Sequence, residues 1–285
     1  MLKEMKKISR WLSSSVYGHL SLWLSSIRTI LMALFILLMT YMLVRSMENS
    51  VSNNQLDVHL GETLFSYANK GFNMIMTSVA FLVMMSELPK RVPYQNYAAM
   101  RLSRGKWLAS LIIFCVGIVF VFVVLMIAAS AFFSISFITP GNGWSDLERL
   151  AMDEDYIHQT QFVAEYIRVL SPVTACMLAA FILYLFWLTM AFLILLFSLC
   201  GAPNLGVVFC ISLVLLNITI LFESLPGIKL PSHFATLGAI VSQVEKNKLE
   251  YVAKVICGYF FIDALLLILL KIRAQHMDIR FVGKE

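Results

Sequence analysis

The residues that could do chemistry in this chain fall in two places. Asp263 is the single charged residue between Val255 and Leu270, in an otherwise apolar stretch. Arg101 and Arg104 lie in a short basic segment between two apolar runs. The sequence contains no Gly-x-Ser-x-Gly, no His-Glu-x-x-His and no Gly-x-x-x-x-Gly-Lys-Ser/Thr phosphate loop. It therefore predicts no catalytic residue and no metal site, and the chain is not expected to be an enzyme.

The composition identifies the solvent around these residues. Of 285 residues, 60% are hydrophobic and 14% are charged, and the mean hydropathy is +0.81. Soluble domains average about 45–50% apolar and about 25% charged residues. These values exclude a soluble enzyme, a disordered protein and a nucleic-acid binder that would use the net charge of +5.

The uncharged runs are much longer than the roughly ten residues of a barrel strand, and several suit helices of about 20 residues. The long run from 169 to 222 is divided by turn residues between Gly201 and Gly206. We expect an all-α integral membrane protein with six transmembrane helices, at 29–45, 68–86, 108–134, 171–199, 205–222 and 253–271.

The distribution of charge predicts the orientation. With an even number of spans both termini lie on one side, and that side carries 14 of the 22 Lys and Arg but four of the 17 Asp and Glu. The positive-inside rule places it in the cytoplasm, which predicts a multi-pass plasma-membrane protein. The expected organisation is a cytoplasmic N-terminus with an interfacial helix at 1–28, a six-helix domain at 29–271, outer loops at 46–67, 135–170 and 223–252, an inner loop at 87–106, and a cytoplasmic tail at 272–285.

Apolar and polar residues alternate at helical spacing before the first span. Trp11, Leu20, Trp23 and Ile27 belong to the apolar series, and serines fill the other face. This pattern is typical of an amphipathic helix lying in the membrane interface. A simple extension of the first span is the alternative.

The inner loop at 87–106 has the most informative pattern. From Gln95 to Lys106 the residues favour a short helix that carries Tyr97, Arg101 and Arg104 on one face. It is too short and polar to cross a membrane, so it must touch headgroups or another protein. The alternative is a basic loop that only enforces the topology.

At this loop the sequence resembles a known family. An acid at the end of the second span, a short cytoplasmic helix and Arg-Leu-Ser-Arg-Gly-Lys-Trp leading into the third span are similar to the permease subunits of type-2 ABC exporters. The resemblance places Glu87 at the family's acid and Arg101, Ser103 and Arg104 at its Arg-x-Ser-Arg stretch. It implies that this loop, with Tyr97, couples the permease to an ATPase.

The resemblance also implies partners and a function. The partners would be two copies of a separate ABC ATPase, a second permease copy or paralogue, and the lipid bilayer, with no nucleic acid. The chain would hold no cofactor, because ATP and Mg would be bound by the ATPase. It would form the export pathway for an apolar or amphipathic substrate, such as a drug, a lipid-linked molecule or an antimicrobial peptide.

Asp263 supports a competing interpretation. A charged residue at mid-membrane costs about 2.5–3.5 kcal/mol on insertion scales, so we expect it to face protein or water. It could line a pathway, contact Asn217 or Asn73 in a neighbouring helix, or be protonated. A proton- or ion-coupled secondary carrier that uses Asp263 is therefore an alternative function, and a non-transporting immunity or accessory membrane protein is another.

One pattern in the second outer loop predicts local structure. Ser145-Asp146-Leu147-Glu148 has the spacing of a capping box, which would begin a short helix.

Overall fold

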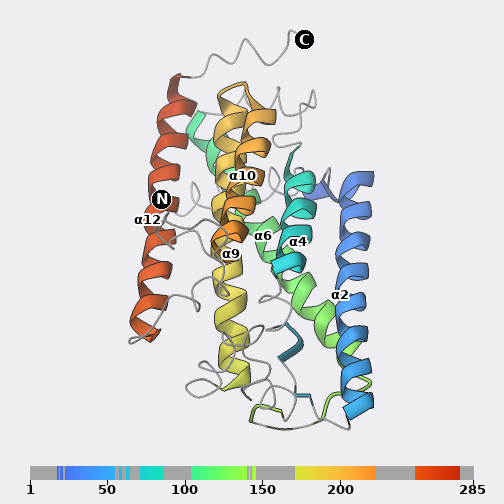
Figure 1. Cartoon of the computed structure of the whole chain (residues 1–285). Helices are drawn as coiled ribbons and strands as arrows, with labels where there is room; N and C mark the ends of the chain where they lie inside the picture. The colour runs from blue at the N-terminus through green and yellow to red at the C-terminus, as the bar shows by residue number, and fades with distance from the viewer. Residues whose placement is uncertain are drawn as a thin grey trace, which may run out of the picture.

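The computed structural model describes residues 18, 20–21, 23–54, 58–59, 62–64, 71–86, 104–139, 141, 143–145, 171–221 and 248–276. Six long helices make up most of this part of the chain, and they run in alternate directions along the bundle (Figure 1). They are α2 (Ile27–Asn54), α4 (Gly71–Met85), α6 (Arg104–Ser134), α9 (Pro172–Leu199), α10 (Pro203–Leu221) and α12 (Lys248–His276). In the described residues, β structure is limited to one isolated parallel bridge between Val58 and Ile138.

Four segments are long and apolar enough to cross a membrane: Ile27–Asn49, Arg104–Ser134, Pro172–Leu199 and Ala253–His276. The described parts of the other two helices include the shorter apolar segments Ile75–Met85 and Pro203–Leu215. At 1.5 Å per residue the 15 residues of α4 extend about 22 Å, less than the roughly 30 Å of a hydrocarbon core. The chain is thus an all-α membrane protein with four candidate spans, and a helix occupies each of the six ranges predicted for spans.

Several helices extend beyond the predicted limits. α2 continues to Asn54, where an outer loop from 46 was expected, and α12 covers Lys248–His276 in place of 253–271. α6 begins at Arg104, so the last residues of the predicted inner loop form its first turn. Charged residues mark where the apolar slab ends, but a helix can continue into water because its hydrogen bonds are internal.

α9 is the central helix, and it packs against α4, α6, α10 and α12. In the middle of the bundle, Trp187 of α9 contacts Phe122 of α6 and Phe81 of α4, with ring centroids 4.7 and 6.0 Å away. Phe81 and Phe122 also contact each other at 5.0 Å, and all three side chains are buried. This aromatic cluster fixes three helices around one point.

The turn between α9 and α10 forms where the glycine and proline residues predicted it. The amide of Ala202 donates to the carbonyl oxygen of Phe197, and Gly201 has a φ of 82°, the left-handed conformation that ends many helices. Pro203 then begins α10. The predicted division of the long apolar run is confirmed.

Residues before α2 are also helical in part. Gly18, Leu20 and Trp23 are helical, and the backbone departs from helix at Ser25 and Ser26 before α2 begins at Ile27. This break favours a separate helix over a simple extension of the first span. Trp23 is buried in the bundle core, so the helix is packed against protein at this point. The rest of the expected interfacial helix, from 1 to 17, lies outside the described residues.

Candidate functional site

Asp263 lies in the α9–α12 interface. Its side chain is 6% exposed, and the hydroxyl Oγ1 of Thr189 on α9 donates to its Oδ1 at 2.7 Å. Of the protein or water surroundings that we expected, the structure shows protein at Asp263. Its partner is Thr189, whereas Asn73, one of the two asparagines considered, has no hydrogen bond from its Nδ2. The side chain of Asn217 lies outside the described residues.

The two helices that hold Asp263 are parallel neighbours in contact along their length. Phe181 and Phe260 meet with ring centroids 6.4 Å apart on one side of the Thr189–Asp263 pair. Toward the other end, the Arg273 side chain donates from Nε to the carbonyl oxygen of Leu199 at 3.3 Å. The Asp263 contact is therefore one of several that hold α12 against α9.

The two helices that hold Asp263 also carry other buried polar atoms without a partner. Among the described residues, Oδ2 of Asp263 has no hydrogen-bond partner, and neither do the hydroxyl of Tyr259 and the Nε1 of Trp187. Tyr259 is one helical turn before Asp263, and Trp187 is two residues before Thr189. A polar group buried without a partner costs about 1–3 kcal/mol, so a polar ligand at Oδ2 of Asp263 would be stabilised.

The chemistry available to this site is that of binding. The described residues contain no group of three or more His, Cys, Asp or Glu that could hold a metal ion. The site can hold a proton or a single positive charge on the carboxyl group, because one carboxylate oxygen is already satisfied by Thr189 and the other is open.

A second polar contact lies at the end of the bundle where α12 finishes. The guanidinium NH1 of Arg104, the first residue of α6, donates to the backbone carbonyl oxygen of Gln275 in the last turn of α12. The last carbonyl groups of a helix have no partner within it, so a cation there also complements the helix dipole. Arg104 therefore ties the start of α6 to the end of α12.

Arg104 is the one residue of the predicted coupling set that the structure describes. Glu87, Tyr97, Arg101 and Ser103 lie outside the described residues. The Arg104 side chain is occupied by a contact within the chain, in addition to any docking role that its place in the predicted loop implies.

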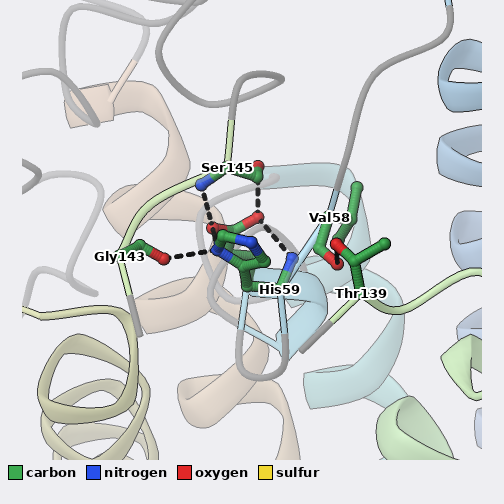
Figure 2. Close-up of polar contacts among 6 residues, drawn as sticks. Val58, His59, Thr139, Gly143 and Ser145 are labelled. Carbon is green, nitrogen blue, oxygen red and sulfur yellow. Dashed lines mark hydrogen bonds and ion pairs between the residues drawn. The ribbon is translucent and has the colours of Figure 1, made fainter. Parts of the chain in front are cut away.

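A third polar assembly joins the segments that follow α2 and α6, and we call it the Glu62 clasp: residues 58, 59, 62, 139, 141, 143 and 145. Figure 2 shows its polar contacts, without Gly141. Glu62 is fully buried. Its Oε1 accepts from the amide of Ser145 at 2.7 Å, and its Oε2 accepts from the hydroxyl of Ser145 at 2.5 Å and from the amide of His59 at 3.2 Å. The carboxylate is thus satisfied by three donors from two segments.

His59 adds the next contacts of the clasp. Its Nδ1 lies 2.5 Å from the carbonyl oxygen of Gly143, and since a carbonyl can only accept, Nδ1 carries the proton. The amide of Thr139 donates to the carbonyl oxygen of Val58 at 3.0 Å. A Cβ at Gly141 would lie 2.7 Å from Cδ2 of His59, so a glycine is required for the close approach.

The Glu62 clasp combines serine, histidine and a carboxylate, but its geometry does not suit nucleophilic catalysis. A nucleophilic serine must give its proton to the imidazole. Here the Ser145 hydroxyl bonds the carboxylate directly, and Ser145 is 1% exposed. The arrangement holds two loops together.

Sequence reasoning missed the clasp. It assigned Ser145 to the cap of a short helix, whose residues from 146 to 148 lie outside the described residues, and it did not foresee that the Ser145 side chain bonds Glu62, 83 residues earlier. The available signal was the position of His59 and Glu62, three residues apart near a predicted span, but nothing in the sequence paired them with Ser145.

The chain matches no protein-family model, no curated protein and no solved structure.

Proposed function

We propose that this chain is the membrane-spanning permease subunit of an ATP-driven ABC exporter. In this proposal all six long helices cross the plasma membrane, both termini are cytoplasmic, and a separate ATPase docks on the segment at 87–106. An apolar or amphipathic substrate moves outward, and a second permease copy or paralogue completes the pathway. The chain itself hydrolyses nothing.

The observation that carries the proposal is the hydrogen bond from Arg104 to Gln275. The segment proposed to dock the ATPase leads directly into α6, and this bond connects the start of α6 to the last turn of α12. A displacement imposed on the docking segment would therefore reach two helices at once.

α6 is suited to carry that displacement across the membrane. It is one continuous helix of 31 residues, and at its far end Phe133 contacts Tyr41 of α2 with ring centroids 5.5 Å apart. α6 thus runs obliquely from α12 to α2 (Figure 1). The Glu62 clasp begins a few residues after its end, so one rigid element connects the proposed docking segment to the opposite end of the bundle.

The proposal is tested by purifying the tagged full-length chain in mild detergent from cells that make it. A polypeptide with a phosphate loop should co-purify, and the complex should hydrolyse ATP. The double variant Arg101→Glu with Arg104→Glu should lose both. Arg45→Glu is the matched control. Arg45 is an exposed arginine in the C-terminal half of α2, and it pairs with Glu48 at 2.6 Å.

Two outcomes contradict different parts of the proposal. If co-purification and ATP hydrolysis both survive the double charge reversal, the docking segment is assigned wrongly. If the wild-type chain brings no ATPase, the ATP-driven mechanism is wrong.

The buried carboxyl group favours a second candidate function, a proton- or ion-coupled carrier. Asp263 is buried at mid-helix with an open oxygen, and intramembrane acids commonly serve ion pathways. The two functions are separated in vesicles that contain this chain alone. An imposed proton gradient would drive substrate accumulation by a carrier, but an ABC permease without its ATPase would not respond.

A further inference from the structure

Thr189 is placed between two hydrogen-bond acceptors. Its Oγ1 lies 2.7 Å from Oδ1 of Asp263 on α12, and 3.0 Å from the carbonyl oxygen of Leu185 one turn earlier on α9. A hydroxyl has one proton to donate and two lone pairs with which to accept. Thr189 can therefore donate to only one of these oxygens at a time.

The ionised and protonated forms of Asp263 use this geometry differently. An ionised carboxylate has no proton, so Thr189 donates to Oδ1. When a proton from water binds at Oδ1, the new carboxyl O–H donates to Oγ1 of Thr189, and the threonine proton turns to the carbonyl oxygen of Leu185. Both forms keep every atom of the pair hydrogen-bonded except Oδ2, and the proton is the only species gained.

We propose that Asp263 and Thr189 form a reversible proton-binding site in the interior of the bundle. Threonine is the residue that lets the site exist in two states, because its hydroxyl reverses direction. A side chain that could only donate would leave the buried O–H of the protonated form without an acceptor. The site does not depend on the energy source of transport, so it stands or falls separately from the ABC proposal.

The open Oδ2 favours uptake of a proton by Asp263. In the ionised form the negative charge lies partly on an oxygen that has no partner among the described residues. Burial of a charge in apolar surroundings is costly, and the bound proton removes that charge. The loss of Thr189 as a donor would act in the same direction, since it takes away the hydrogen bond that stabilises the ionised form.

Few groups compete for this proton. Among the described residues, the hydroxyls of Tyr184 on α9 and Tyr259 on α12 interact electrostatically with Asp263. α9 has no charged residue between Pro172 and Leu199. α6, which also packs against α12, has none between Trp107 and Ser134. Asp263 is therefore the group in this region that can gain and lose a proton.

A proton at this site would change the contact between two helices. The hydrogen bond between Thr189 and Asp263 joins α9 to α12. A bond to a charged acceptor is roughly twice as strong as a neutral one, so uptake of the proton weakens this contact without removing it. The site thus links protonation to the packing of α12.

The experiment is infrared difference spectroscopy of the full-length chain in lipid nanodiscs, recorded as a pH titration. A carboxylic-acid C=O band should appear reversibly as pH falls, and it should be absent in Asp263→Asn. Thr189→Val removes the donor and should move the midpoint of the titration to higher pH by about one unit, the difference between a charged and a neutral hydrogen bond. Thr189→Ser keeps the hydroxyl and should titrate as the wild type does.

Thr40→Val is the matched control. Thr40 is a buried threonine of α2 whose Oγ1 likewise donates to the carbonyl oxygen four residues earlier, that of Ile36, at 2.9 Å. It should leave the band unchanged. If Asp263→Asn does not fold, labelling of the wild type with a hydrophobic carbodiimide, which reacts with protonated carboxyl groups, replaces it. Modification at Asp263, mapped by peptide mass spectrometry, should increase as pH falls.

Either of two results overturns the proposal. One is a wild-type protein in which neither the infrared band nor carbodiimide labelling at Asp263 changes with pH, which would mean a permanently ionised or permanently protonated group. The other is a Thr189→Val variant that titrates like Thr189→Ser.

Discussion

The Glu62 clasp should open when the charge on Glu62 is removed. In Glu62→Gln the amide oxygen can replace one carboxylate oxygen, but the NH2 group must take the place of the other. It then faces either the amide N–H of Ser145 or that of His59, so a donor meets a donor. The loss of a hydrogen bond to a buried charged group costs about 1.5–3 kcal/mol. Local opening should become roughly 10- to 150-fold more frequent.

Hydrogen exchange at the Ser145 amide measures this opening directly. The amide is protected by its bond to Glu62, and local unfolding limits its exchange. Glu48→Gln is the matched control, because Glu48 pairs with Arg45 in an exposed contact within one helix, a type that contributes little. If Glu62→Gln accelerates exchange at Ser145 no more than Glu48→Gln does, the clasp does not hold the two loops together and the reasoning is refuted.

Two further substitutions extend this test. Gly141→Ala should displace the His59 ring and accelerate exchange at the Ser145 amide in the same assay, and normal protection would show that the loop absorbs the Cβ without opening. Trp187→Ala should cost about 3–5 kcal/mol by emptying the aromatic cluster, measured as a lower unfolding temperature in detergent. Phe132→Ala, at a residue that is 71% exposed, should change that temperature little, and equal effects would contradict the central role of the cluster.

The positions of the helices could be predicted because one physical constraint dominates them. A backbone in lipid must satisfy its own hydrogen bonds, so long apolar runs become helices, and the run between 169 and 222 has to break where Gly201 and Pro203 allow a turn. The ends of the helices were predicted less well. Arg104 was assigned to a loop because it is charged, but charge shows the edge of the apolar slab rather than the last helical residue.

For buried polar side chains, the sequence predicted that a partner is needed but not which residue the partner is. The cost of burying Asp263 predicted that it would face protein or water, and the structure has it buried against protein. The identity of the partner depended on the rotation of α9 against α12, and no periodicity in the sequence records that rotation. Thr189 lies 74 residues away and looks like any other threonine in an apolar helix.

The Glu62 clasp was beyond prediction for a related reason. Its partners are mostly backbone groups, the donating amides of Ser145 and His59 and the accepting carbonyl of Gly143, and nearly every residue type carries such groups. A sequence pattern reports side chains, so a carboxylate satisfied by backbone donors leaves no partner motif. Only the close approach of Gly141 to His59 restricts a residue type.

The three polar assemblies together limit how this bundle can move. Arg104 holds the start of α6 to the end of α12, and the Glu62 clasp holds the segment after α6 to the segment after α2. α6 is therefore restrained at both ends by partners on opposite sides of the bundle. The Thr189–Asp263 bond lies in the interior, between α9 and α12. A rearrangement between α9 and α12 keeps both restraints on α6, and that is the interface whose buried ionisable contact can change strength when it takes up a proton.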